Sequence, residues 1–139
     1  RLLQKVQADY FRFLYDMGGL TSLAATGENL NGAISKHYID YYRGRIAFVL
    51  SHSHSLTVVP VLFQEVEPGF PVFSQATDGM IFRNSADSLK QNYPNSKYVK
   101  ALEKEAERRL SVMELDARLQ NAEEVGFPDI ELPATDYNG

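Results

Sequence analysis

The residues from Tyr98 to Ala122 are YVKALEKEAERRLSVMELDARLQNA, and their pattern sets the fold class expected for the chain. Apolar residues recur every three or four positions, which is the spacing of one face of an α-helix. The first stripe consists of Tyr98, Leu102, Ala106, Leu110, Met113 and Ala117, and the second consists of Val112, Leu115, Leu119 and Ala122. Glu105 precedes Arg109 by four positions, in the order that stabilises a helix. The stretch therefore predicts one long helix with a solvated outer face.

Two further helical patterns lie at the beginning of the chain. The first consists of Leu3, Val6, Tyr10, Phe13, Met17 and Leu20. Gly18 and Gly19 lie inside it and predict that this helix ends or bends there. The second pattern has two stripes, which are Ile34, Tyr38 and Tyr41, and Ile39, Tyr42, Ile46 and Val49. A face this wide predicts a helix packed between neighbours, and Gly44 on it suggests close approach to another backbone.

The middle of the chain is less regular. Residues 56–63 have strand propensity, but Pro60 argues against a central strand, and so short a run does not separate a buried strand from a buried helix. Glu67 to Pro71 contain two prolines and a glycine, and they predict a loop. Asp78 is the expected cap of a further helix, with an apolar face of Phe82, Ala86, Leu89 and Tyr93. Pro94-Asn95-Ser96 would end that helix and cap the long one.

Composition limits the class of protein. The chain has 139 residues, of which 44% are hydrophobic and 23% are charged, as in an ordinary globular domain. The net charge of −4 argues against an electrostatic nucleic-acid binder. The sequence has no run of about 18 apolar residues, so it predicts no transmembrane segment. It also has no cysteine, which excludes a disulfide, a thiol nucleophile and a thiolate metal site within these residues.

The last fourteen residues, GFPDIELPATDYNG from Gly126 to Gly139, break with the helical pattern before them. Two prolines favour an extended backbone, and apolar residues alternate at Ile130 and Leu132. Asn138-Gly139 is a turn signal that normally joins two strands. We therefore expect a helical domain over residues 1–125 and an extended tail that is the first part of a further domain.

The tail pattern Gly-Phe-Pro-Asp-Ile-Glu-Leu-Pro-x-x-x-x-Asn-Gly resembles the opening of the thioredoxin-like domain in extracytoplasmic bacterial thiol:disulfide oxidoreductases and peroxiredoxin-like proteins. The helical part is similar to the region ahead of that domain in multidomain members from Bacteroidetes-type bacteria, at residues 38–42 and 87–102. The resemblance implies that residues 56–63 form a short helix, which gives a mainly α bundle of about five helices. It also implies a periplasmic or membrane-anchored parent. The family's redox cysteines have no counterpart here, so no catalytic residue or cofactor site carries over.

The function implied by the resemblance is that of a non-catalytic accessory region. It would position the downstream thioredoxin-like domain, or contact a protein substrate or a second copy of the chain. This chain alone would not be an enzyme, whereas the parent would exchange thiols and disulfides through a mixed disulfide. The alternative is a stand-alone helical scaffold with no attached enzyme, whose Phe127, Ile130 and Leu132 would pack back onto the bundle. Tyr93-Pro94-Asn95-Ser96 is typical of helical-repeat scaffolds, but no second copy of it lies about 34 residues away.

Three groups of residues suggest a binding site, and each has a simpler structural explanation. The imidazoles available for a metal are those of His37, His52 and His54. They lack an obvious fourth ligand, and solvated loop histidines explain the pair near residue 53 better. An aromatic and basic cluster consists of Tyr38, Tyr41, Tyr42, Arg43 and Arg45. It would suit a ligand groove, but a core helix whose arginines reach water explains it better. The mixed charges of residues 103–109 indicate a solvated helix surface, so the sequence predicts no catalytic, cofactor or metal residue.

Overall fold

The computed structural model describes residues 1–125, and these residues form a mainly α protein, as predicted. Its helices are α1 (Leu2–Ala24), α2 (Asn31–Ser51), α3 (Val58–Leu62), α4 (Asp78–Asn92) and α5 (Lys97–Val125). Two short strands, β1 (Glu65–Glu67) and β2 (Phe70–Pro71), lie between α3 and α4. The five predicted helices are thus confirmed, and the predicted extended tail over residues 126–139 lies outside the described residues.

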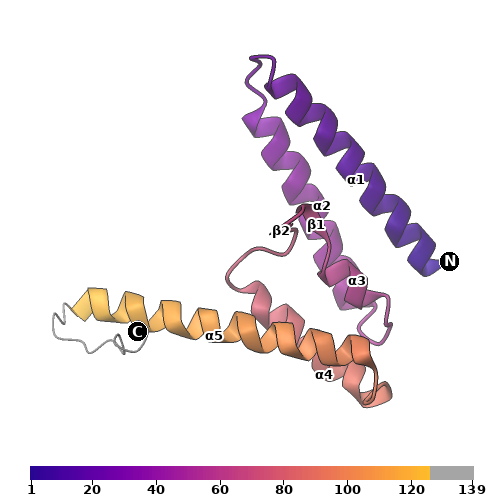
Figure 1. Ribbon diagram of the computed structural model, residues 1–139, viewed down its shortest axis with the longest axis vertical. Coiled ribbons are helices and arrows are strands. Elements are labelled where there is room, and N and C mark those ends of the chain that lie inside the picture. The colour runs from indigo at the N-terminus through magenta and orange to yellow at the C-terminus, as the bar shows by residue number, and fades with distance from the viewer. Residues whose placement is uncertain (126–139) are drawn as a thin grey trace.

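The helices form two arms (Figure 1). One arm is the antiparallel hairpin of α1 and α2, and the other is the antiparallel hairpin of α4 and α5 (Figure 1). Helix α3 contacts both α2 and α5, so it lies where the arms meet. The turn of the first arm contains Gly27 with φ of 105°, a backbone conformation that side chains other than hydrogen disfavour.

Helix α1 continues through Gly18 and Gly19 to Ala24, so the helix does not end at the two glycines. Glycine costs about 1 kcal/mol relative to alanine in a helix interior. The side chains of Phe13 and Met17, one turn earlier, are buried in the core, and packing of this kind outweighs a local propensity.

Helix α3 confirms the choice of a short helix for the middle of the chain. Pro60 is its third residue, where the missing N–H has no partner within the helix. Val58, Val61 and Leu62 have 0% exposure, so burial overrides their β-strand propensity.

The predicted loop at residues 67–71 is in fact part of a small β-hairpin. Glu67 pairs with Phe70 across a tight turn, and Gly69 there has φ of 88°. The pairing is short and irregular, which is why the Pro-Gly signal alone did not separate a hairpin from a loop.

Helices α4 and α5 approach each other closely at Gly79. A Cβ atom at that position would lie 3.1 Å from the Cβ of Arg109 and 3.3 Å from Cδ2 of Leu110. Gly44, where close approach was predicted, has no atom within 4 Å of such a Cβ, so that prediction is wrong. Ser96 begins α5 as predicted, because its Oγ accepts the N–H groups of Tyr98 and Val99 at 3.1 and 3.4 Å.

The core lies at the meeting point of the two arms. Its fully buried side chains come from α1, α3, the segment after β2, α4 and α5, and they include Val6, Val58, Leu62, Val72, Phe73, Phe82, Leu89, Val99 and Leu102. One hydrophobic core therefore links the arms.

Candidate functional site

The segment between α3 and α4, residues 64–78, is the structural joint between the two arms, and we call it the joint segment. Helix α2 holds it with three tyrosine hydroxyls. Tyr38 donates to the carbonyl of Val72 at 2.5 Å, and Tyr41 donates to Oε1 of Gln64 at 2.5 Å. Tyr42 donates to Oδ1 of Asp78 at 2.6 Å. Tyr41 and Tyr42 lie three and four positions after Tyr38, so one side of the helix makes three separate attachments to the segment.

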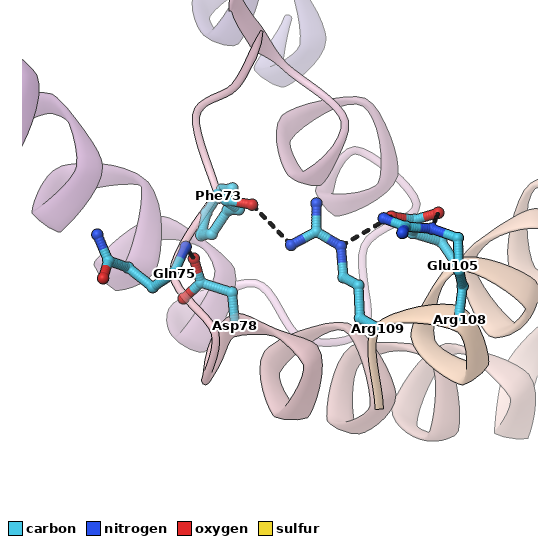
Figure 2. A network of polar contacts seen from close by, with 6 residues as sticks. All are labelled: Phe73, Gln75, Asp78, Glu105, Arg108 and Arg109. Carbon is cyan, nitrogen blue, oxygen red and sulfur yellow. Dashed lines mark hydrogen bonds and ion pairs between the residues drawn. The ribbon is translucent and has the colours of Figure 1, made fainter. Parts of the chain in front are cut away.

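Asp78 is the last residue of the joint segment and the first residue of α4. Its side chain is buried, and its Oδ2 accepts the N–H of Gln75 at 2.9 Å (Figure 2). Together with the bond from Tyr42, both carboxylate oxygens are satisfied. The prediction that Asp78 caps α4 is therefore wrong: Thr77 is the N-cap residue, and the carboxylate of Asp78 binds the preceding turn and α2 rather than the amides of α4.

Helix α5 holds the same segment from the opposite side through Arg109 (Figure 2). Its Nη1 donates to the carbonyl of Phe73 at 2.6 Å, and its Nε donates to Oε2 of Glu105 at 2.8 Å. Arg108 also donates to both oxygens of Glu105, at 3.1 and 2.7 Å. The hydrogen bonds from Arg108 hold the pKa of the Glu105 carboxyl below its ordinary value, and those from Arg109 act in the same direction.

Aromatic rings continue this attachment into the core. Phe73 lies 5.6 Å from Tyr42 and 6.3 Å from Phe82 between ring centroids. The guanidinium of Arg109 lies over Phe82 at 4.1 Å, within the range of a cation–π interaction. One residue of the joint segment, Phe73, therefore touches α2 and α4 through its ring and α5 through its carbonyl.

Burial raises the pKa of Tyr41 to about 12. Its ring stacks on Phe13 of α1, with 4.0 Å between centroids, and Arg45 lies over it at 4.9 Å. The hydroxyl therefore stays protonated at ordinary pH and acts as a donor to Gln64.

The end of α5 leaves the bundle and projects beyond α4 (Figure 1). Of residues 111–122, which we call the connector half, only Met113 and Ala122 are partly buried, and the others are exposed. Val112, Leu115 and Leu119 are 48%, 47% and 42% exposed, so these three members of the second predicted stripe are not buried by the described residues. The buried face of α5 is instead set by Val99, Leu102 and Ala106.

A cleft of about 880 Å³ opens between α1, α2 and the β-hairpin. Its lining includes Met17, Tyr38, Glu65 and Val66. The hydroxyl of Tyr10 closes the free edge of β1, because it donates to the carbonyl of Glu65 at 2.6 Å and accepts its N–H at 3.3 Å.

The structure does not bring the three histidines together. His37 lies in α2 and His52 is the C-cap residue that follows it, fifteen positions later, which corresponds to about 22 Å along the helix axis. His52 stacks on Phe48 at 4.1 Å, and its Nδ1 is 3.0 Å from the Phe48 carbonyl. Within residues 1–125, no group of three or more His, Asp or Glu side chains is arranged to hold a metal ion.

The residues of the aromatic and basic cluster on α2 do not form one site. The three tyrosines belong to the joint described above, and Arg43 is exposed. Arg45 does not reach water as predicted: its side chain is 13% exposed, and its Nε and Nη1 are buried without a hydrogen-bond partner among the described residues. It lies over Tyr41 and Phe48 and 4.0 Å from Asp9, so ring faces take the place of hydrogen-bond acceptors.

The described part of the chain thus defines a helical protein with a hydrogen-bonded joint and a projecting helix. Within that part, no helix has the length and apolar content to cross a bilayer. Comparison with family models, curated proteins and solved structures gives no match for this chain. The sequence reasoning found Tyr38, Tyr41 and Tyr42 as a group, but missed Phe73 and Gln64, because their role depends on partners distant in sequence.

Proposed function

We propose that residues 1–125 are a non-catalytic accessory region that positions a thioredoxin-like redox domain in an extracytoplasmic thiol:disulfide oxidoreductase. The observation that carries the proposal is the connector half of α5. It projects from the bundle with an uncovered apolar stripe, and it leads into residues whose sequence resembles the opening of that domain.

The joint supports a positioning role. Arg109 ties the carbonyl of Phe73 to α5, and the tyrosines of α2 hold the same segment from the other arm. The direction of α5 is therefore coupled to both arms rather than set by a flexible linker. A helix of this kind transmits orientation, because it is stiff and rises about 1.5 Å per residue.

The apolar stripe supports contact with an attached domain. Val112, Leu115 and Leu119 recur at spacings of three and four, so they lie on one side of the connector half. An attached domain that covered this stripe would remove apolar surface from water, which stabilises the contact. The redox step itself would be thiolate attack on a disulfide by cysteines of that domain, with the helical region setting which substrates approach.

The first test is to read the coding sequence past Gly139 for a few dozen codons. We expect a strand followed by Cys-x-x-Cys at the start of a helix. A stop codon, or a continuation without cysteine, would reject the proposal and favour the stand-alone scaffold.

The second test uses the full-length protein and measures the rigidity of the connection by solution scattering. Val112→Asp with Leu115→Asp should loosen the arrangement of the two domains, because charges cannot be buried there. The matched control, Glu114→Lys with Arg118→Glu on the same half-helix, changes charge without touching the stripe and should leave the scattering unchanged. Equal scattering of the stripe variant and the natural protein would show that the stripe makes no domain contact.

A further inference from the structure

The outer face of α1 carries a second stripe that the core does not use. Its members are spaced by four and three residues in alternation, and they are Gln4, Ala8, Phe11, Tyr15, Gly18 and Ser22. All six are exposed, and none is charged. Phe11 is 64% exposed and Tyr15 is 80% exposed, the two largest apolar exposures on this helix. Alternation of this kind is the pattern of a helix that packs against another helix along a seam.

The order of residue types along the stripe is symmetric about Phe13. Each side of Phe13 has one aromatic residue, then one small residue, then one polar uncharged residue. When two copies of the helix lie antiparallel about a two-fold axis at that position, Phe11 meets Tyr15, Ala8 meets Gly18, and Gln4 meets Ser22. Every level of the seam then pairs two aromatic, two small or two polar uncharged residues.

We propose that this stripe is a homodimer surface, in which α1 packs antiparallel against α1 of a second copy. The small residues on either side of the aromatic pairs allow the helices to approach closely. A Cβ added at Gly18 would have no atom within 4 Å, and a hollow of about 780 Å³ lies beside it, lined by Leu14, Gly19 and Leu23 among others. The partner's rings have room to enter there.

The charges beside the stripe fit a pairing with a second copy. Two ion pairs lie along one edge, Lys5–Asp9 at 3.3 Å and Arg12–Asp16 at 3.2 Å, so this edge offers charges of both signs to an identical edge running the other way. A partner of one dominant charge would find no complementary field on this face.

The area fits a weak dimer. Four aromatic side chains, two from each copy, would bury on the order of 500 Å² together with their neighbours. That is below the size of a standard stable interface, so we expect a weak dimer that dissociates on dilution. The pairing uses no residue of the connector half, so its failure would leave the proposed positioning role intact.

The first experiment is sedimentation equilibrium of the 139-residue chain from about 5 µM to about 500 µM, where mass action shifts a weak dimer. We expect a monomer–dimer equilibrium that Phe11→Glu weakens at least tenfold. Phe70→Glu is the matched control, because Phe70 is 61% exposed but lies in β2, away from the stripe. A chain that is monomeric throughout, or a dimer that Phe11→Glu leaves unchanged, would overturn the proposal.

The second experiment tests the antiparallel register of the two helices by disulfide formation. The natural chain has no cysteine, so only the introduced cysteines can form disulfides. Ala8→Cys and Gly18→Cys variants, mixed under mild oxidation, should form the 8–18 heterodisulfide. Ala8→Cys alone should form little homodisulfide, since the two positions would lie about 15 Å apart along the axis. Homodisulfides of Ala8→Cys that form as fast as the heterodisulfide would refute the antiparallel arrangement. A monomer that instead co-sediments with phosphatidylcholine vesicles through Phe11 and Tyr15 would assign the face to a lipid surface and overturn the dimer.

Discussion

Tyr41 holds a proton through burial, and this gives the protein a predicted alkaline transition. An ordinary tyrosine titrates near 10.0, whereas the pKa of Tyr41 is about 12 in the folded chain. The folded state thus binds this proton more tightly than the unfolded state does. Its stabilising effect is complete below pH 10 and is lost as the pH rises from 10 to 12.

We therefore expect Tyr41→Phe to have a shallower loss of unfolding free energy above pH 10 than the natural chain. At pH 7 the variant should be less stable by about 1 kcal/mol, because Gln64, which is 6% exposed, loses its hydroxyl donor. Urea unfolding at several pH values measures both effects. Tyr15→Phe, at a side chain 80% exposed, is the control and should change neither. Identical alkaline profiles for Tyr41→Phe and the natural chain would contradict the assignment.

Glu105 makes the opposite contribution at acid pH. Its pKa is lowered from an ordinary 4.5, first by the hydrogen bonds from Arg108. The carboxylate therefore stabilises the fold above pH 4.5, and this contribution is lost as the pH falls through the lowered folded value. Glu105→Gln should reduce the unfolding free energy at pH 7 by about 1 kcal/mol, a value limited by the exposure of Arg108. Below pH 4.5, the unfolding free energy of this variant should also fall less steeply with pH than that of the natural chain.

The control for Glu105→Gln is Glu114→Gln, on the exposed connector half of the same helix. Urea unfolding from pH 7 to pH 3 should leave that variant close to the natural chain. If both variants lost the same stability, the effect would come from net charge and not from the network around Glu105.

At the scale of the elements, α4 and α5 fit together because Gly79 has no side chain. Gly79→Leu should lower the unfolding free energy by about 1–3 kcal/mol, since a Cβ would already lie 3.1 Å from that of Arg109. Gly44→Leu has open space and should be neutral or stabilising by about 0.5–1 kcal/mol through helix propensity. Thermal unfolding followed by circular dichroism compares the two. A stable Gly79→Leu would mean that the helices can move apart freely.

The contrast between these glycines shows where sequence reasoning stops. Helical periodicity and capping signals are local properties, so the first predicted the long helix at residues 98–122 and the second predicted the cap at Ser96. Whether a glycine faces another backbone depends on which helices pack together, and a single sequence does not carry that information. The hydrogen bonds of the joint could not be predicted for the same reason. The stripes placed Tyr38 and Tyr41 on one helix, but the acceptors of their hydroxyls lie on the joint segment, more than twenty positions away. Gln64 and Phe73 gave no periodic signal at all.

At the scale of the whole molecule, the orientation of the two arms depends on a few contacts to the joint segment. The three tyrosine hydroxyls of α2 donate hydrogen bonds to three residues of the joint segment. On the side of α5, Arg109 donates a hydrogen bond to the carbonyl of Phe73 (Figure 2). Removal of Arg109 leaves the carbonyl of Phe73 without its donor, and it also removes a cation from the ring of Phe82. The arms would remain folded, because each is a hairpin with its own helix contacts.

Arg109→Ala should therefore broaden the distribution of distances between the arms more than it lowers helicity. Pulsed electron paramagnetic resonance measures the distance distribution between two spin labels, one at Lys36 on α2 and one at Gln120 on α5, which are both exposed. The natural chain should give one narrow distribution, and the variant a wider one with little loss of circular dichroism. Arg118→Ala, on the exposed part of α5, should retain the narrow distribution. A narrow distribution in Arg109→Ala would mean that the aromatic core alone orients α5, and that the polar network adds stability without setting direction.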